Sequence, residues 1–247
     1  MGIRKHGCDG VKNVEKNTKK GRIHGKRTFF SLMLMRKLTH VGPALATLYL
    51  HEYHFDRYND VVALCTGLFF VLLFTDDLRR RNASIHSQYS KLMYMKPHEN
   101  KCIGASVYYF IGVLINLYFG LLAERYRVFC VVGILCLGLG DPAAWICGYT
   151  FPIRKLYGSK KSLGGFIGCL GVSFIFSYLI LTSWSTKKYA SDGVYFFCSD
   201  VNVLSLLSAI VAASTELFIE HDNLFIPVLT CASLVCLEFT CSCLRAV

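Results

Sequence analysis

The sequence has little charge. Only 17% of its 247 residues are charged, whereas 53% are hydrophobic, and the mean hydropathy is +0.42. Soluble domains seldom combine so much apolar content with so little charge. Several windows of about 15 to 20 residues contain no charged side chain, and such lengths suit helices that cross a hydrocarbon layer roughly 30 Å thick. The composition therefore argues against a water-soluble enzyme and predicts one polytopic membrane domain.

The sequence also lacks the local patterns of several other classes. Most of the twelve cysteines stand in apolar runs, where cysteine behaves as a small hydrophobe, and no CxxC pair occurs, so neither disulfides nor a zinc site is expected. A Walker A motif with Gly158 as its second glycine is excluded, because Ile153 stands where the motif needs its first glycine and Ser159 stands where it needs lysine. The motif set of protein kinases, the Gly-Gly-Asp-Gly loop of soluble lipid kinases and the Asp-Gly…Ala-Arg pattern of CDP-alcohol phosphotransferases are missing as well.

Positive charge is concentrated at the N-terminus. Residues 1–40 contain eleven Lys/Arg and two acidic residues, which gives +9 of the total charge of +11. A basic segment can bind nucleic acid or an anionic membrane surface, but no aromatic residue for base stacking precedes Phe29. Residues 4–28 are also too polar for the apolar core of a signal peptide. We therefore expect residues 1–28 to form a disordered cytosolic tail near lipid headgroups, and no nucleic-acid partner.

The remaining residues, 29–247, are expected to form the membrane domain. Open strands cannot satisfy their backbone groups in lipid, so each apolar segment is interpreted as a helix. There are seven such segments: 41–55, 60–75, 104–123, 128–147, 163–182, 200–216 and 224–244. The first two are short enough to form a tilted hairpin instead of two full spans. With a cytosolic N-terminus, the segments on the cytosolic side hold 21 of the 27 Lys/Arg, in keeping with the positive-inside rule. The prediction is an all-α protein with about seven transmembrane helices and no glycan at the sequon Asn82-Ala-Ser84, which faces the cytosol.

Under this topology, four polar clusters gather at the cytosolic ends of the helices. Each also has a structural interpretation, such as a basic flank that reaches the headgroups or a loop with internal ion pairs. Asp141 stands out, because an acidic residue inside a glycine-rich apolar helix is costly unless it has a partner or a function; Arg154 or Lys160 would be its ordinary ion-pair partner. The clusters are Arg36, Lys37 and His40; residues 76–82; residues 138–165; and Glu216, Glu220, His221, Asp222 and Asn223.

The third and fourth clusters also contain residue types that bind phosphate and metal ions. Glycines allow the backbone to approach a ligand, and exposed N–H groups beside lysines suit phosphate. Ser162 could serve as a phosphate ligand or as a helix cap. The carboxylates of Glu216 and Asp222 could hold a divalent cation or merely neutralise the basic loops.

These stretches resemble the CTP-dependent diacylglycerol kinases of fungal type, to which the phytol and dolichol kinases are related. The resemblance covers roughly residues 33–230 and rests on Met35-Arg36-Lys37-Leu38-Thr39-His40, Gly140-Asp141-Pro142-Ala143-Ala144 with Gly148, Lys161-Ser162-Leu163-Gly164-Gly165, and Glu216 with the run from Asp222 to Pro227. Two positions depart from the family pattern. His221 stands where the family often has a second acidic residue, and Gly165 stands where many relatives have serine.

The resemblance implies an integral membrane protein of the endoplasmic reticulum and nuclear envelope that phosphorylates diacylglycerol to phosphatidate with CTP and a divalent cation, Mg or Ca. The implied catalytic residues are Arg36, Lys37, Asp141 and Gly148. We expect the nucleotide at Arg154, Lys160, Lys161, Ser162, Gly164 and Gly165, and the metal at Asp141, Glu216 and Asp222. In this hypothesis the basic residues clamp the triphosphate, Asp141 orients the lipid hydroxyl or holds the cation, and Gly148 keeps the turn after Asp141 open.

Two alternatives stay open from the sequence. One is a polyprenol or phytol kinase that uses the same nucleotide machinery on another lipid alcohol. The other is a small transporter or scaffold without enzymatic activity, in which Asp141 and Asp222 would line an ion path.

Overall fold

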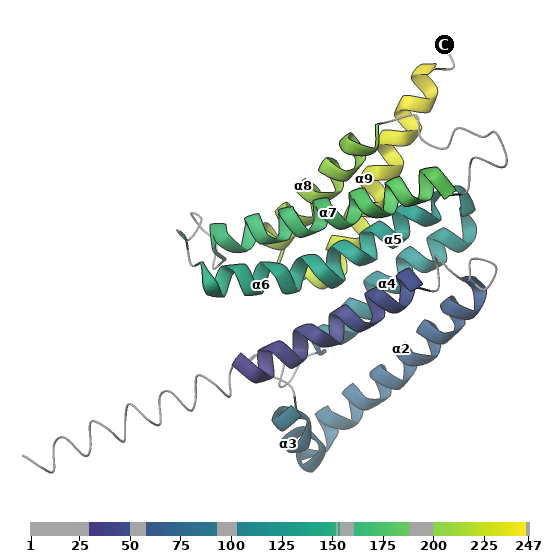
Figure 1. Ribbon diagram of the computed structural model, residues 1–247. Coiled ribbons are helices and arrows are strands. Elements are labelled where there is room, and N and C mark those ends of the chain that lie inside the picture. Colours follow the sequence, from purple (N-terminus) through teal and green to yellow (C-terminus); the bar gives the residue numbers. More distant parts are fainter. Residues whose placement is uncertain are drawn as a thin grey trace, which may run out of the picture.

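The computed structural model describes residues 30–49, 58–92, 103–151, 153, 161–187 and 200–245, and these residues form helices and short connections without a strand (Figure 1). A helix over residues 30–49 comes first. It is followed by α2 (Tyr58–Arg81), α3 (Ala83–Leu92), α4 (Ala105–Leu122), a short 3-10 turn (Glu124–Tyr126), α5 (Arg127–Leu135), a π-helical turn (Cys136–Gly140), α6 (Asp141–Thr150), α7 (Leu163–Lys187), α8 (Val201–Phe218) and α9 (Asp222–Arg245).

Six helical stretches in the described part of the chain are long and apolar enough to cross a membrane. They are Tyr58–Arg81, Ala105–Leu122, Glu124–Thr150, Leu163–Ser183, Val201–Phe218 and Asp222–Leu244. The prediction of an all-α polytopic membrane protein is therefore confirmed. The first predicted segment, 41–55, differs from the structure, which has a helix over residues 30–49. This helix is not among the six candidate spans, and residues 50–57 lie outside the described residues. The predicted tail, residues 1–28, lies outside them as well.

The second predicted segment also ends later than expected. The sequence places residues 76–82 in a loop, but α2 continues to Arg81, and α3 follows after Asn82. The charged residues are tolerated at this helix end because they pair along it: Asp76 with Arg79 and Arg80, and Asp77 with Arg80 and Arg81. The Asn82 Oδ1 accepts a hydrogen bond from the Ser84 N–H at 2.9 Å, which caps the start of α3.

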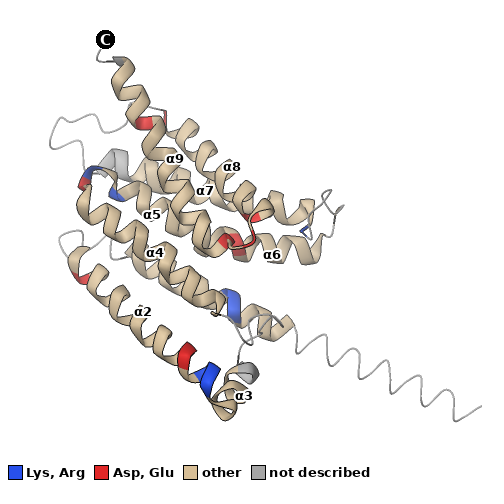
Figure 2. Ribbon diagram, turned by 180° about the vertical axis from the view of Figure 1, so that it is seen from behind, with Lys and Arg blue, Asp and Glu red and all other residues tan. Residues whose placement is uncertain are grey.

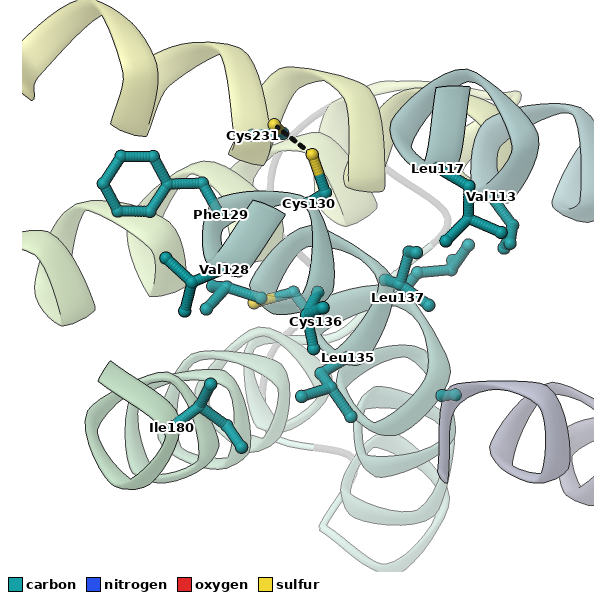
Figure 3. Close-up of a cluster of buried hydrophobic side chains, with 14 of the residues drawn as sticks. Val113, Leu117, Val128, Phe129, Cys130, Leu135, Cys136, Leu137, Ile180 and Cys231 are labelled. Carbon is teal, nitrogen blue, oxygen red and sulfur yellow. Dashed lines mark hydrogen bonds between the residues drawn. The ribbon is translucent and has the colours of Figure 1, made fainter. Parts of the chain in front are cut away.

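Helix α5 is the centre of the bundle. Every residue from Val128 to Leu135 is buried, as expected for a helix that is apolar all round and is covered on all sides by other helices. Figure 3 shows Val128, Phe129 and Leu135 of this helix among side chains of α4, α7 and α9. The peripheral helix α2, in contrast, has few buried residues and presents most of its apolar surface outward, which suits contact with lipid.

Glycines allow α9 to pass close to α4 and α5. A Cβ at Gly112 would lie 2.9 Å from Pro227 Cγ, and a Cβ at Gly133 would lie 2.5 Å from the Pro227 carbonyl oxygen. Small residues at such crossings let backbones approach closely, which is how membrane helices gain packing energy without a hydrophobic driving force. These contacts fix the first half of α9, and with it Asp222, against the central helices.

Candidate functional site

Asp141 lies at a break in the regular helix. The π-helical turn Cys136–Gly140 directly precedes it, and Pro142 follows it as the second residue of α6. Proline has no N–H for the carbonyl four residues earlier, so the regular hydrogen-bond ladder is interrupted at this point. Wide turns of this kind occur frequently at functional sites. Asp141 lies inside the span Glu124–Thr150 and is only 3% exposed.

The carboxylate of Asp141 meets the first polar cluster. Lys37 Nζ lies 2.5 Å from both carboxylate oxygens, and His40 Nδ1 lies 3.2 Å from Oδ2. Lys37 and His40 are three positions apart on one helix and therefore share a face. Both side chains of the Lys37–Asp141 pair are largely buried, at 14% and 4% exposed, so the pair is shielded from water and screening is weak.

A tyrosine of α4 fixes the position of His40. The imidazole stacks on the ring of Tyr109 with centroids 4.7 Å apart, and the Tyr109 hydroxyl donates a hydrogen bond to the His40 carbonyl at 2.8 Å. Side chain and backbone of His40 are thus both held by the same residue. Three elements, the helix over residues 30–49, α4 and α6, converge on this point.

A second ionic group joins α8, α9 and the chain just before α7. Lys161 Nζ lies 2.9 Å from Glu216 Oε1 and 2.8 Å from Asp222 Oδ2, and it also donates to the backbone carbonyl of Glu216. Burial alone would lower the pKa of Lys161, but the charges of Asp222 and Glu216 outweigh it and hold this pKa above the ordinary value. At the first residue of α9, Asp222 accepts the Asn223 N–H on its other oxygen, at 2.9 Å.

The two ionic groups form one site. A carboxylate oxygen from each of Asp141, Glu216 and Asp222 lies within 4.8 Å of the other two. Carboxylate oxygens are the ligands that Mg²⁺ and Ca²⁺ prefer, so this donor set fits a divalent cation. Figure 2 shows acidic residues near the start of α6 and the α8–α9 turn, and basic residues on the helix over residues 30–49. The structure thus brings together the three predicted metal ligands; their role as ligands stays a prediction.

Three further basic residues were predicted to belong to the site. Arg36 is buried, at 9% exposed, on the same helix as Lys37. Arg154 and Lys160, predicted to bind the nucleotide or to pair with Asp141, lie outside the described residues.

The glycines of the third cluster lie between two helices. Gly148 lies inside α6, so the open turn predicted after Asp141 is wrong. A Cβ on Gly148 would lie 2.8 Å from Ser162 Oγ, one on Gly164 would lie 2.1 Å from the Phe151 carbonyl oxygen, and one on Gly165 would lie 2.8 Å from the Ala144 carbonyl oxygen. In the structure these glycines allow α6 and α7 to pack closely.

Ser162 has the geometry of a helix cap. Its Oγ accepts the backbone N–H of Gly165 at 3.2 Å, three residues into α7, which is the usual bond of an N-cap serine. The sequence left two interpretations open for Ser162, a phosphate ligand and a helix cap. The described hydrogen bond is the one that the helix-cap interpretation requires. Phosphate binding by Ser162 stays a prediction.

Comparison with known proteins finds a lipid-kinase relative. The chain is 25% identical over 169 residues to the dolichol kinase Sec59 of Schizosaccharomyces pombe, and the match covers 66% of this chain but only 32% of that protein. The chain thus matches about a third of the length of this relative. No family model and no solved structure matches the chain. The similarity agrees with a lipid-kinase resemblance in general and does not favour diacylglycerol kinases over dolichol kinases.

Sequence reasoning missed part of this arrangement. His40 was recognisable as a polar neighbour of Lys37, because its spacing places it on the same helix face. Tyr109 gave no signal, since a tyrosine in an apolar helix is ordinary core. The π-helical turn was signalled only by Pro142 inside an apolar stretch, which predicts an interruption but not its form.

Proposed function

We propose that this protein is a CTP-dependent lipid kinase that transfers a phosphoryl group to a lipid alcohol at the cytosolic surface of the endoplasmic reticulum membrane. The observation that carries the proposal is the meeting of Asp141, Glu216 and Asp222 with Lys37 and Lys161 inside a bundle of membrane helices. Phosphoryl transfer needs little covalent chemistry from a protein. It needs phosphate, acceptor hydroxyl and compensating charge to be held in line.

The contacts suggest how these tasks are divided. Lys37 contacts both oxygens of Asp141 and His40 contacts one, so we assign Asp141 a positioning role for these two side chains in addition to its place in the carboxylate group. Asp141, Glu216 and Asp222 together would hold a divalent cation. Such a cation would supply positive charge that neutralises the phosphates.

The lysines have a double role in this proposal. In the structure Lys37 and Lys161 neutralise carboxylates, and both have flexible stems of four carbons. When a nucleotide is bound, the same ammonium groups, together with the buried Arg36, are within the region where triphosphate oxygens need cationic partners. Diffusion within the bilayer brings the lipid alcohol to the site from the side, whereas the nucleotide arrives from the cytosol.

Two acceptor classes remain as candidates. The family pattern in the sequence favours diacylglycerol, with phosphatidate as the product. The similarity to a dolichol kinase favours a polyprenol alcohol equally. Because the nucleotide machinery serves either acceptor, the distinction depends on the surface that meets the lipid tail.

The test is a transfer assay with the purified chain in lipid vesicles. CTP labelled at the γ-phosphate is supplied with diacylglycerol, dolichol or phytol, and with ATP as the comparison donor. We expect labelled lipid phosphate with one of the alcohols, and its loss in Asp141→Ala. Asp60→Ala, which removes an exposed aspartate in the first turn of α2, serves as the matched control and should stay active. Absence of transfer to all three alcohols would favour a transporter or scaffold and refute the proposal.

A further inference from the structure

Two consecutive tyrosines of α4 lie against the two halves of the site. Tyr109 stacks on His40 with ring centroids 4.7 Å apart, and Tyr108 stacks on His221 with centroids 4.8 Å apart. Neighbouring residues of an α-helix point in directions about 100° apart, so a single turn of α4 reaches two different segments. One segment is the helix over residues 30–49, and the other is the turn that leads into α9.

Tyr109 holds the first of these segments through two contacts. Besides the stacking of the rings, its hydroxyl donates a hydrogen bond to the His40 carbonyl at 2.8 Å. Tyr109 is only 1% exposed, and a hydrogen bond that is shielded from water is electrostatically stronger than one in water. Because Lys37 and His40 both reach Asp141 from this helix, Tyr109 determines how the helix presents them.

Tyr108 acts on the start of α9. The His221 carbonyl accepts the backbone N–H groups of Leu224 and Phe225 at 3.0 and 3.2 Å, so His221 directly precedes and caps the helix on which Asp222 is the first residue. The ring of His221 is on the exposed side of this turn, where the half-buried ring of Tyr108 stacks on it. Holding His221 therefore holds the backbone of Asp222, whose carboxylate belongs to the group that fits a divalent cation.

The same end of α4 is packed closely against α9. The buried Asn223 donates through Nδ2 to the Ala105 carbonyl at 3.4 Å. A Cβ at Gly112 would lie 3.0 Å from the Asn223 carbonyl oxygen. Closely packed interiors transmit a displacement to their neighbours, so a shift of this part of α4 reaches the start of α9.

We propose that Tyr108 and Tyr109 are positioning residues that set the two halves of the site separately, an inference that rests on the proposed kinase function. Tyr108 acts through His221 on Asp222 and thus on cation binding. Tyr109 acts through His40 on the helix that carries Lys37 and thus on the transfer step. Phosphoryl transfer depends on groups that are held in line, so residues that only fix these distances contribute to its rate.

The experiment measures transfer and cation binding separately, with the full chain in phosphatidylcholine vesicles. Tyr109→Phe keeps the ring and loses the hydroxyl. We expect its kcat to fall about 10-fold, because a misplacement of about 1 Å can cost about 100-fold and the stacked ring still holds part of the geometry. Tyr108→Leu removes the stacked ring. We expect its Kd for Mn²⁺, measured by electron paramagnetic resonance of the free ion, to rise about 10-fold, as when a residue that orients a metal ligand is lost.

Conservative and matched variants separate positioning from packing. Tyr108→Phe keeps the stacking and should bind Mn²⁺ as the unmodified chain does. Tyr118→Phe and Tyr118→Leu are the controls, because Tyr118 is an exposed tyrosine of the same helix, and they should change neither kcat nor the Kd for Mn²⁺. Tyr109→Phe should affect kcat more than Mn²⁺ binding, and Tyr108→Leu should do the reverse.

Two results would overturn the inference while the kinase function stands. One is a lower Tm of Tyr109→Phe and Tyr108→Leu with unchanged kcat and unchanged Kd for Mn²⁺, which is what a purely structural role predicts. The other is an equal loss of both quantities in both variants, because the two halves would then not be set separately. If the unmodified chain binds Mn²⁺ but transfers phosphate to no alcohol, the proposed function itself fails, and the inference fails with it.

Discussion

Removing either partner of the buried ion pair between Lys37 and Asp141 should lower the stability of the folded protein by several kcal/mol. At 2.5 Å and an effective dielectric constant of about 20, two unit charges attract each other by about 7 kcal/mol. Desolvation offsets much of this in the intact pair. Removing one partner leaves the other charge buried without compensation, which typically costs about 3–5 kcal/mol. We therefore expect Lys37→Met, which keeps the length of the side chain, to lower the free energy of unfolding by that amount.

The assay is thermal or denaturant unfolding of the purified chain in detergent micelles, followed by circular dichroism. Arg81→Met is the control, because Arg81 pairs with Asp77 at 2.8 Å but is 77% exposed, and an exposed pair contributes at most about 1 kcal/mol. The double variant Lys37→Met/Asp141→Asn should be less destabilised than the sum of the two single variants. If Lys37→Met loses no more stability than Arg81→Met, or if the two single effects simply add, the reasoning about this pair is wrong.

Three further outcomes can be measured with the same preparation. Gly164→Ala should destabilise the fold by about 1–3 kcal/mol in thermal unfolding, because its Cβ would collide with the carbonyl oxygen of Phe151, directly after α6, whereas Gly171→Ala, with open space around it, should be nearly neutral. Ser162→Ala should cost about 1 kcal/mol of stability through the lost cap; a large loss of nucleotide affinity with unchanged stability would instead support the predicted phosphate role of Ser162. Asn82 should carry no glycan when the chain is expressed in a glycosylating cell and its mass is determined, and a glycan there would place α3 on the opposite side of the membrane.

The fold class followed from composition because the membrane leaves few choices. A long apolar segment in lipid must be helical, so the existence of six of the seven predicted helices could be read from uncharged windows. The ends of the helices could not be predicted in this way, because hydropathy indicates where a segment enters the lipid and not where its backbone stops being helical. Thus α2 continues through Asp77 to Arg81, and the described part of the first helix already includes residue 30, well before the apolar segment predicted at 41–55.

The candidate site was predictable by residue type but not by pairing. Charges inside or beside apolar helices are costly, which is why Lys37, Asp141, Glu216 and Asp222 stood out. Their partners depend on how helices distant in sequence pack, and one chain gives no measure of that. Lys37 and Asp141 are 104 positions apart, and no pattern in either segment identifies the other.

The packing that creates this pairing depends on Gly138, a glycine that the sequence did not indicate as a site residue. A Cβ on Gly138 would lie 2.2 Å from Ala44 Cβ and 3.1 Å from the His40 carbonyl oxygen, so only glycine lets the first helix approach the chain this closely. Gly138 lies three residues before Asp141, in the π-helical turn. Because Lys37 and His40 reach Asp141 from that same helix, any larger residue at position 138 would push both away from the carboxylate. A glycine can therefore be essential for activity by setting the distance between two helices, without contacting the nucleotide or the lipid.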